Sequence, residues 1–162
     1  INFDYQKEAT VDAQCMASAE TAYARYAKAV ADPGFNVLSY ISSHDTKLFF
    51  SDYQDFDFQK RAANSFLMLP GQVQTYYGDE SGRKLMKHGG YMDQSLRSDM
   101  NWNDISKAEN ADLIAHWSKL QKFRLVHPAI AEGTHTRISK KPYAFMRVKG
   151  KDKVVVASAG RK

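Results

Sequence analysis

The spacing of apolar and polar residues predicts alternating helices and strands in the first part of the chain. Residues 5–31 are rich in Ala with scattered Glu, Gln and Lys and contain neither Pro nor Gly, which predicts one long helix. An apolar run at residues 37–41 predicts a buried strand, and a helix is predicted at about residues 59–68. A second β-prone run at residues 73–77 predicts another strand. This order of helices and strands is typical of an α/β fold.

Two long segments have no periodic pattern. Residues 42–57 form an aromatic loop, and residues 83–103 combine polar side chains with a glycine pair. Loops of this length in a compact domain are usually functional or disordered. Between the second loop and His127-Pro128, residues 107–126 carry apolar side chains on one helical face, which predicts a helix. The apolar residues of this face are Leu113, Ile114, Trp117, Leu120 and Phe123.

The last third of the chain has the pattern of an antiparallel sheet. Three short strands joined by tight turns are predicted at residues 134–139, 143–148 and 154–159. The composition changes between Pro128 and Gly133. We therefore predict a domain boundary there, with a first domain at residues 1–130 and a second at residues 131–162.

Composition narrows the class of protein and of partner. The 162 residues are 43% hydrophobic and 25% charged, which is typical of a globular chain with one sizeable core. No apolar run approaches the roughly 20 residues of a membrane span, and no signal peptide is visible, so no membrane partner is expected. The net charge of +5 is compatible with a polyanion. Basic and acidic residues are mixed, however, so a solvated basic face is favoured and no nucleic acid is expected.

Cysteine and histidine usage argues against a disulfide or a metal site within this chain. Cys15 is the single cysteine, so it either stays buried or pairs with a cysteine outside the chain. Five histidines occur, and no two of them have the H-x-x-x-H spacing of a helical metal site. We expect no metal bound by this chain.

Polar residues follow both predicted strands of the first part. The first strand runs into Ser42-Ser43-His44-Asp45, and the second runs into Gly78-Asp79-Glu80. In a β/α barrel the catalytic groups lie at these carboxyl ends of the strands. A polar turn with a capping carboxylate is the alternative, and the residues alone leave both interpretations open.

Four motifs add a resemblance to a known family. They are Tyr40-Ile41-Ser42-Ser43-His44-Asp45-Thr46, Gln74-Thr75-Tyr76-Tyr77-Gly78-Asp79-Glu80-Ser81-Gly82, Arg97-Ser98-Asp99-Met100-Asn101-Trp102, and the stretch at residues 123–130. Together, and in this order, they resemble the α-amylase family of glycoside hydrolases, in particular its bacterial periplasmic members. The resemblance covers the chain from about residue 35 to its end. It implies the C-terminal fragment of a (β/α)8 barrel, about the last two β/α units, followed by a small antiparallel β-domain.

The resemblance also implies an activity and roles for four residues. The family hydrolyses α-1,4-glucosidic bonds in starch or maltodextrins with retention, so an α-glucan is the expected substrate. By resemblance, Asp45 is the carboxylate that stabilises the transition state, and His44 donates a hydrogen bond to the same sugar. Asp93 and Arg97 have the D-x-x-x-R spacing with which some members bind the neighbouring glucose. An ion pair in a surface loop is the alternative for these two residues.

Other residues of the motifs have weaker interpretations. Asp79 and Glu80 are expected to secure their loop rather than to bind substrate. Four aromatic residues are candidates to stack on sugar faces, with packing in the core as the more frequent alternative. They are Phe49, Phe50, Tyr77 and Trp102.

The chain departs from the family in two catalytic residues. The family's nucleophile lies in a G-F-R-x-D type of stretch and its general acid follows the next strand, and neither stretch occurs here. We therefore expect the isolated chain to be inactive. We expect the rest of the parent enzyme, or a second copy of the chain, to cover the helix face near Trp117. No cofactor is expected in this chain, calcium is possible in the intact parent, and the resemblance implies a periplasmic or secreted location.

A non-catalytic carbohydrate-binding or assembly module is the alternative function. The absence of the nucleophile and the general acid is compatible with both functions. The complete His44-Asp45 motif favours the enzyme, because a binding module has no need of a residue that stabilises a transition state.

Overall fold

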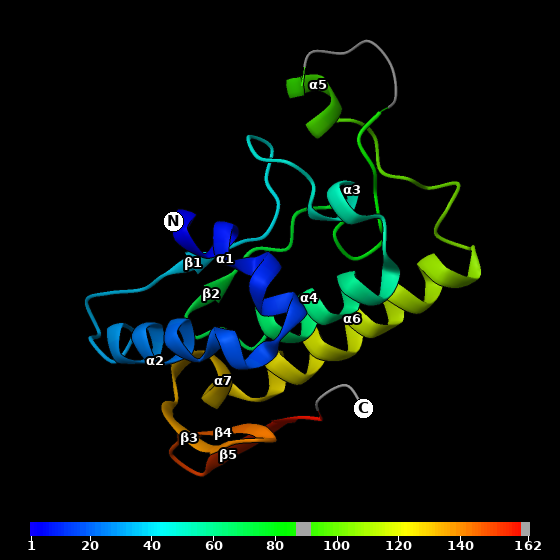
Figure 1. Ribbon diagram of the computed structural model, residues 1–162. Helices are drawn as coiled ribbons and strands as arrows, with labels where there is room; N and C mark the ends of the chain where they lie inside the picture. Colours follow the sequence, from blue (N-terminus) through cyan, green and yellow to red (C-terminus); the bar gives the residue numbers. More distant parts are fainter. Residues whose placement is uncertain (87–91, 160–162) are drawn as a thin grey trace.

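The computed structural model in Figure 1 describes residues 1–86 and 92–159, apart from the side chains of Met92 and Asp93. The helices are α1 Phe3–Gln14, a 3₁₀ helix at Met16–Ala19, α2 Glu20–Ala29, α3 Phe49–Tyr53, α4 Phe56–Phe66, α5 Met92–Leu96, α6 Ala108–Val126 and α7 Pro128–Glu132. The strands are β1 Leu38–Ser39, β2 Gln72–Val73, β3 Thr134–Lys140, β4 Tyr143–Lys149 and β5 Asp152–Ser158. No helix in the described part of the chain is both long enough and apolar enough to cross a membrane.

The prediction of one continuous helix at residues 5–31 is wrong. The helix ends before Cys15, whose backbone is extended (φ −149°, ψ 106°), and resumes as the 3₁₀ helix and α2. Side chains of α4 bind the carbonyl groups at the end of α1: Ser65 Oγ donates to the Asp12 oxygen at 2.9 Å, and Arg61 Nε donates to the Ala13 oxygen at 3.2 Å. Tertiary hydrogen bonds thus replace the helical ones that the alanine-rich sequence favours. The Cys15 side chain is exposed, so it is not a buried apolar residue.

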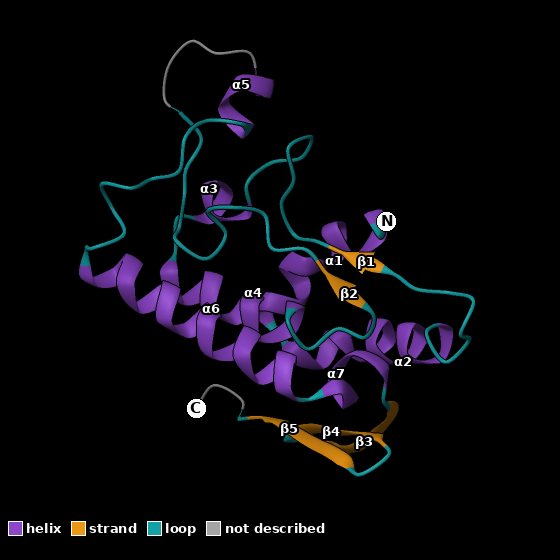
Figure 2. Cartoon of the chain, turned by 180° about the vertical axis from the view of Figure 1, so that it is seen from behind, coloured by secondary structure: helices purple, strands orange, loops and turns teal. Residues whose placement is uncertain are grey.

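The two predicted strands are present and pair in parallel. Leu38 lies opposite Gln72 and Ser39 opposite Val73, so each strand is shorter than its apolar run. On the other side of β1, Asn2 bridges Ser39 in parallel, and its backbone N–H donates to the Leu38 oxygen at 2.7 Å. Asn2, β1 and β2 are therefore three successive parallel strand positions, each followed by helices in the sequence. Figure 2 shows β1 and β2 side by side. The sequence pattern did not indicate the position of Asn2, because only one residue of it forms the bridge.

The helix at residues 107–126 is confirmed as α6, and the chain itself covers its apolar face around Leu113 and Trp117, while Phe123 of the same face is 37% exposed. Leu113 and Trp117 are fully buried, and the Trp117 ring lies 6.1 Å from the ring of Phe66 on α4. The expectation that the face near Trp117 contacts a partner is therefore wrong, because α4 occupies this face. The short helices α3, α5 and α7 were not predicted; α3 and α5 lie within the two segments predicted as loops.

The antiparallel meander is confirmed. Strands β3, β4 and β5 form one sheet in that order, on the side of the molecule opposite α3 and α5 (Figure 1). Tyr143, Phe145 and Val154 of this sheet belong to the same buried cluster as Tyr23 of α2 and Ile130 of α7. The core is thus continuous across residue 130, and the division into two domains stays a prediction.

Candidate active site

His44 and Asp45 lie in a loop that begins directly after β1. The loop is closed at its base by Ser42, whose Oγ accepts a hydrogen bond from the Phe49 backbone N–H at 2.9 Å and donates to Asp79 Oδ1 at 2.5 Å. Because Asp79 follows β2, this contact ties together the carboxyl ends of the two strands. The residues that carry the predicted chemistry therefore sit on a loop anchored at both of its ends.

The tip of the loop directs Asp45 to the surface. Ser43 Oγ accepts from the Asp45 backbone N–H at 3.1 Å and lies 3.0 Å from Thr46 Oγ1, and Ser43 and Thr46 also form a β-bridge. The side chains of His44 and Asp45 are 55% and 69% exposed. Tyr40 is buried near Asp45. Burial raises the pKa of Tyr40, and the charge of Asp45 raises it further to a smaller extent.

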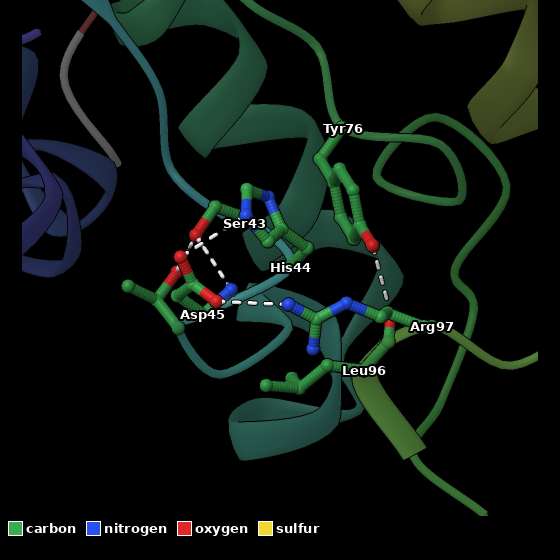
Figure 3. A network of polar contacts seen from close by, with 7 residues as sticks. Ser43, His44, Asp45, Tyr76, Leu96 and Arg97 are labelled. Atoms are coloured by element: carbon green, nitrogen blue, oxygen red, sulfur yellow. Dashed lines mark hydrogen bonds and ion pairs between the residues drawn. The ribbon is translucent and has the colours of Figure 1, made fainter. Parts of the chain in front are cut away.

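Both carboxylate oxygens of Asp45 have partners. His44 Nε2 lies 3.0 Å from Oδ2, and Arg97 Nη2 donates to Oδ1 at 3.0 Å (Figure 3). Arg97 is 52 positions away in the sequence, and the D-x-x-x-R spacing paired it with Asp93, so its contact with Asp45 was not predicted. An exposed pair of this kind contributes little to stability, about 0–1 kcal/mol. Its effect is to orient the carboxylate.

The predicted pairing of Asp93 with Arg97 stays a prediction. Asp93 lies in α5, one turn before Arg97, and its side chain is outside the described part of the chain.

The acidic residues after β2 bind the backbone of their own loop. Asp79 is 3% exposed, its Oδ2 accepts from the Tyr76 N–H at 3.3 Å, and its backbone oxygen accepts from Gln59 Nε2 at 2.8 Å. Glu80 Oε2 accepts from the Gly78 N–H at 2.9 Å. These contacts agree with the expectation that Asp79 and Glu80 secure the loop. Burial raises the pKa of Asp79 to about 7, even though the hydrogen bond from Ser42 favours the ionised form.

The four aromatic candidates fall into two groups. Phe49 and Phe50 are buried; Phe49 stacks on Phe58 with ring centroids 5.6 Å apart. They are packing residues of the core in this structure. Tyr77 and Trp102 are 37% and 67% exposed. The ring of Tyr77 already packs against Arg83 and Tyr76, whereas Trp102 is exposed over most of its surface.

A buried arginine beneath the site was not predicted. Arg83 is 2% exposed and binds the backbone on both sides of Arg97. The sequence shows it only as a basic residue in an aperiodic loop, which is a pattern that usually indicates a solvent-exposed side chain. No group of three or more His, Cys, Asp and Glu side chains that could hold a metal ion is present among the described residues.

Comparisons with known proteins place this geometry in context. The chain matches no family model. It is 44% identical, over an alignment of 162 residues, to the periplasmic alpha-amylase of Escherichia coli strain K12. The alignment covers 99% of this chain and 23% of that protein, so the chain spans about a quarter of the length of this relative.

Solved structures share the fold of the chain. The alpha-amylase from Anoxybacillus superposes with a TM-score of 0.71 at 20% identity, covering 97% of this chain and 35% of that one. The alpha-amylase from H. orenii superposes with a TM-score of 0.67 at 21% identity, covering 96% and 38%. AmyP in complex with maltose gives a TM-score of 0.57 at 18% identity, covering 74% and 30%. The expected fold, the C-terminal part of a (β/α)8 barrel followed by a small antiparallel β-domain, is confirmed.

Proposed function

Since the chain belongs to the α-amylase family of glycoside hydrolases, we propose that it supplies Asp45 and His44 to an active site that hydrolyses α-1,4-glucosidic bonds. Starch or maltodextrins are the proposed substrates, and the reaction retains the configuration of the anomeric carbon. The observation that carries the proposal is the position of Asp45. Its carboxylate stands exposed at the carboxyl end of β1, oriented by His44 and Arg97.

Asp45 has the properties needed to stabilise the transition state. Retaining hydrolysis passes through a state that resembles an oxocarbenium ion, with a nucleophilic carboxylate and an acid about 5 Å apart. A third carboxylate beside the sugar accepts hydrogen bonds from its hydroxyl groups and attracts the positive charge that develops on the ring. This attraction grows as the charge grows, so it lowers the barrier rather than only tightening substrate binding.

His44 and Arg97 have supporting roles in the proposal. The imidazole of His44 is more than half exposed, which gives a sugar hydroxyl access to a ring nitrogen as donor. The guanidinium of Arg97 offers a planar set of donors beside Asp45, and we propose that it binds the neighbouring glucose together with Asp93. The maltose complex of AmyP, which shares the fold, supports a glucan as the substrate.

The nucleophile and the general acid are proposed to come from the rest of the enzyme. Asp45 can provide neither function while it serves as the transition-state stabiliser, and the family's two corresponding stretches do not occur in this sequence. We therefore propose that the isolated chain is inactive and that the remaining part of the barrel, or a second copy of the chain, completes the site. The periplasmic relative supports a periplasmic or secreted location.

The test is the release of reducing ends from soluble starch. The intact enzyme that contains this chain is compared with its Asp45→Asn variant and with Asp57→Asn, a carboxylate that is 81% exposed on α4. Loss of one preorganised electrostatic group lowers kcat by about 100- to 1000-fold, so Asp45→Asn should lose activity and Asp57→Asn should keep it.

Three outcomes would contradict the proposal. Full activity of the intact Asp45→Asn enzyme would remove Asp45 from catalysis. Retardation of the intact protein in a starch-containing gel without any release of reducing ends would favour the non-catalytic binding module. The isolated chain is assayed in parallel, and activity there would disprove the claim that two carboxylates are missing.

A further inference from the structure

Arg83 carries a positive charge that is buried, so its N–H groups need partners in the protein in place of water. Its side chain lies in the loop after β2 and is 2% exposed. Within the residues that the structure describes, it has no carboxylate oxygen within 4.0 Å. Removing a guanidinium from water is unfavourable unless its N–H groups find other acceptors.

The acceptors of Arg83 lie on both sides of Arg97. Nη2 donates to the Leu96 oxygen at 3.1 Å, and Nη1 donates to the Ser98 oxygen at 3.2 Å and to Ser98 Oγ at 2.9 Å. Nε donates to the Tyr77 oxygen at 3.1 Å. One planar group thus joins the loop after β2 to the residues immediately before and after Arg97.

Two tyrosines bind the same carbonyl groups. The Tyr76 hydroxyl donates to the Leu96 oxygen at 3.0 Å, and the Tyr77 hydroxyl donates to the Ser98 oxygen at 2.7 Å. The guanidinium carbon of Arg83 also lies 4.0 Å from the centroid of the Tyr77 ring, a cation–π contact. Figure 3 shows the Tyr76–Leu96 hydrogen bond next to the contact between Arg97 and Asp45.

We propose that Arg83 is a positioning residue for the active site, which fixes the backbone on both sides of Arg97 so that its guanidinium meets the Asp45 carboxylate. This inference rests on the proposed function of Asp45. A lysine could not replace Arg83. Its single ammonium group cannot reach the Leu96 oxygen and both Ser98 oxygens at once, because these acceptors lie on the two sides of Arg97. Arg83 does not touch substrate; it acts through Arg97.

A double-mutant cycle in the intact enzyme tests this relation, with maltodextrin hydrolysis as the assay. The variants are Arg83→Lys, Arg97→Met and their combination. Because a misplacement of about 1 Å can cost on the order of 100-fold, we expect Arg83→Lys to lower kcat/KM at least about tenfold in the wild-type background. In the Arg97→Met background it should lower kcat/KM by less than about twofold, since the residue that it positions is gone.

Arg124→Lys is the matched control. Arg124 donates to the carbonyl oxygens of Leu67, Leu69 and Gly71, so it makes the same type of contact at the opposite end of β2. Arg124→Lys should change kcat/KM by the same factor in the wild-type background and in the Arg97→Met background. An equal factor for Arg83→Lys in both backgrounds would overturn the inference, because it would show a general structural effect.

The outcomes separate this inference from the proposed function. If Asp45→Asn keeps full activity, the proposed function fails. If Asp45→Asn is inactive while Arg83→Lys has wild-type kcat/KM, only the positioning role fails.

If Arg83→Lys does not unfold cooperatively, Tyr76→Phe takes its place in the cycle, because it removes one donor to the Leu96 oxygen. Tyr76→Phe should lower kcat/KM about threefold with Arg97 present and not at all without it, and equal effects would again overturn the inference.

Discussion

Asp79 makes the stability of the protein depend on pH, and Asp79→Asn should remove the contribution of this residue. The carboxyl group is buried between the two strand ends, where Oδ1 accepts from Ser42 and Oδ2 accepts from the Tyr76 N–H. An amide can keep both contacts if its oxygen faces Tyr76 and its NH₂ group donates to Ser42 Oγ. The asparagine therefore imitates the protonated acid at almost constant shape.

The sign and size follow from the pKa of Asp79, which burial raises to about 7 in the folded protein. In the unfolded chain the pKa is about 3.9, so between pH 4 and pH 7 the folded state holds a proton that the unfolded state has lost. The free energy of unfolding therefore falls as pH rises through this window and is constant above it. Over the two units from pH 5 to pH 7 the loss is about 3 kcal/mol, at about 1.4 kcal/mol per unit.

Urea denaturation of wild type, Asp79→Asn and the exposed control Asp57→Asn at pH 5 and pH 8 measures this effect. The pKa of the buried Asp12 is also raised to about 7. Because Asp12 is present in both proteins, its contribution to the pH dependence of stability cancels when the variant is compared with wild type. The free energy of unfolding of Asp79→Asn, relative to that of wild type, should rise by about 3 kcal/mol from pH 5 to pH 8. The corresponding difference for Asp57→Asn should change by less than about 1 kcal/mol. A difference between Asp79→Asn and wild type that is equal at both pH values would refute the reasoning.

Two further predictions compare residues of one type in different environments. Trp117→Ala should lower the free energy of unfolding by about 3–5 kcal/mol because Trp117 is fully buried, whereas Trp102→Ala, at 67% exposure, should change it by less than about 0.5 kcal/mol in the same denaturation assay. Gly78→Ala should destabilise by about 2–4 kcal/mol, since φ is +96° and the new Cβ would lie 2.4 Å from the Cβ of Arg83. Gly150→Ala, with φ of +58° and no atom within 4 Å, should cost only about 1 kcal/mol; equal losses at the two glycines would contradict the steric argument.

The sequence by itself determined the elements that depend on neighbouring residues. The apolar face of α6 recurs every three or four residues, and the strands of the meander alternate and are separated by turns, so both were predicted with nearly correct bounds. The motif at residues 40–46 indicated in addition that Asp45 follows a parallel strand. These features could be predicted because helix and strand geometry relates residues that are only a few positions apart.

Tertiary structure decided the features that depend on distant residues. The contact of Arg97 with Asp45 joins residues 52 positions apart, and the break of the first helix at Cys15 depends on donors from α4. The burial of Arg83 follows from carbonyl acceptors around Arg97, and local periodicity contains no information about them. The reason is that a helix or strand pattern records which side of an element is apolar, while the identity of the group that covers that side is set only when the whole chain packs.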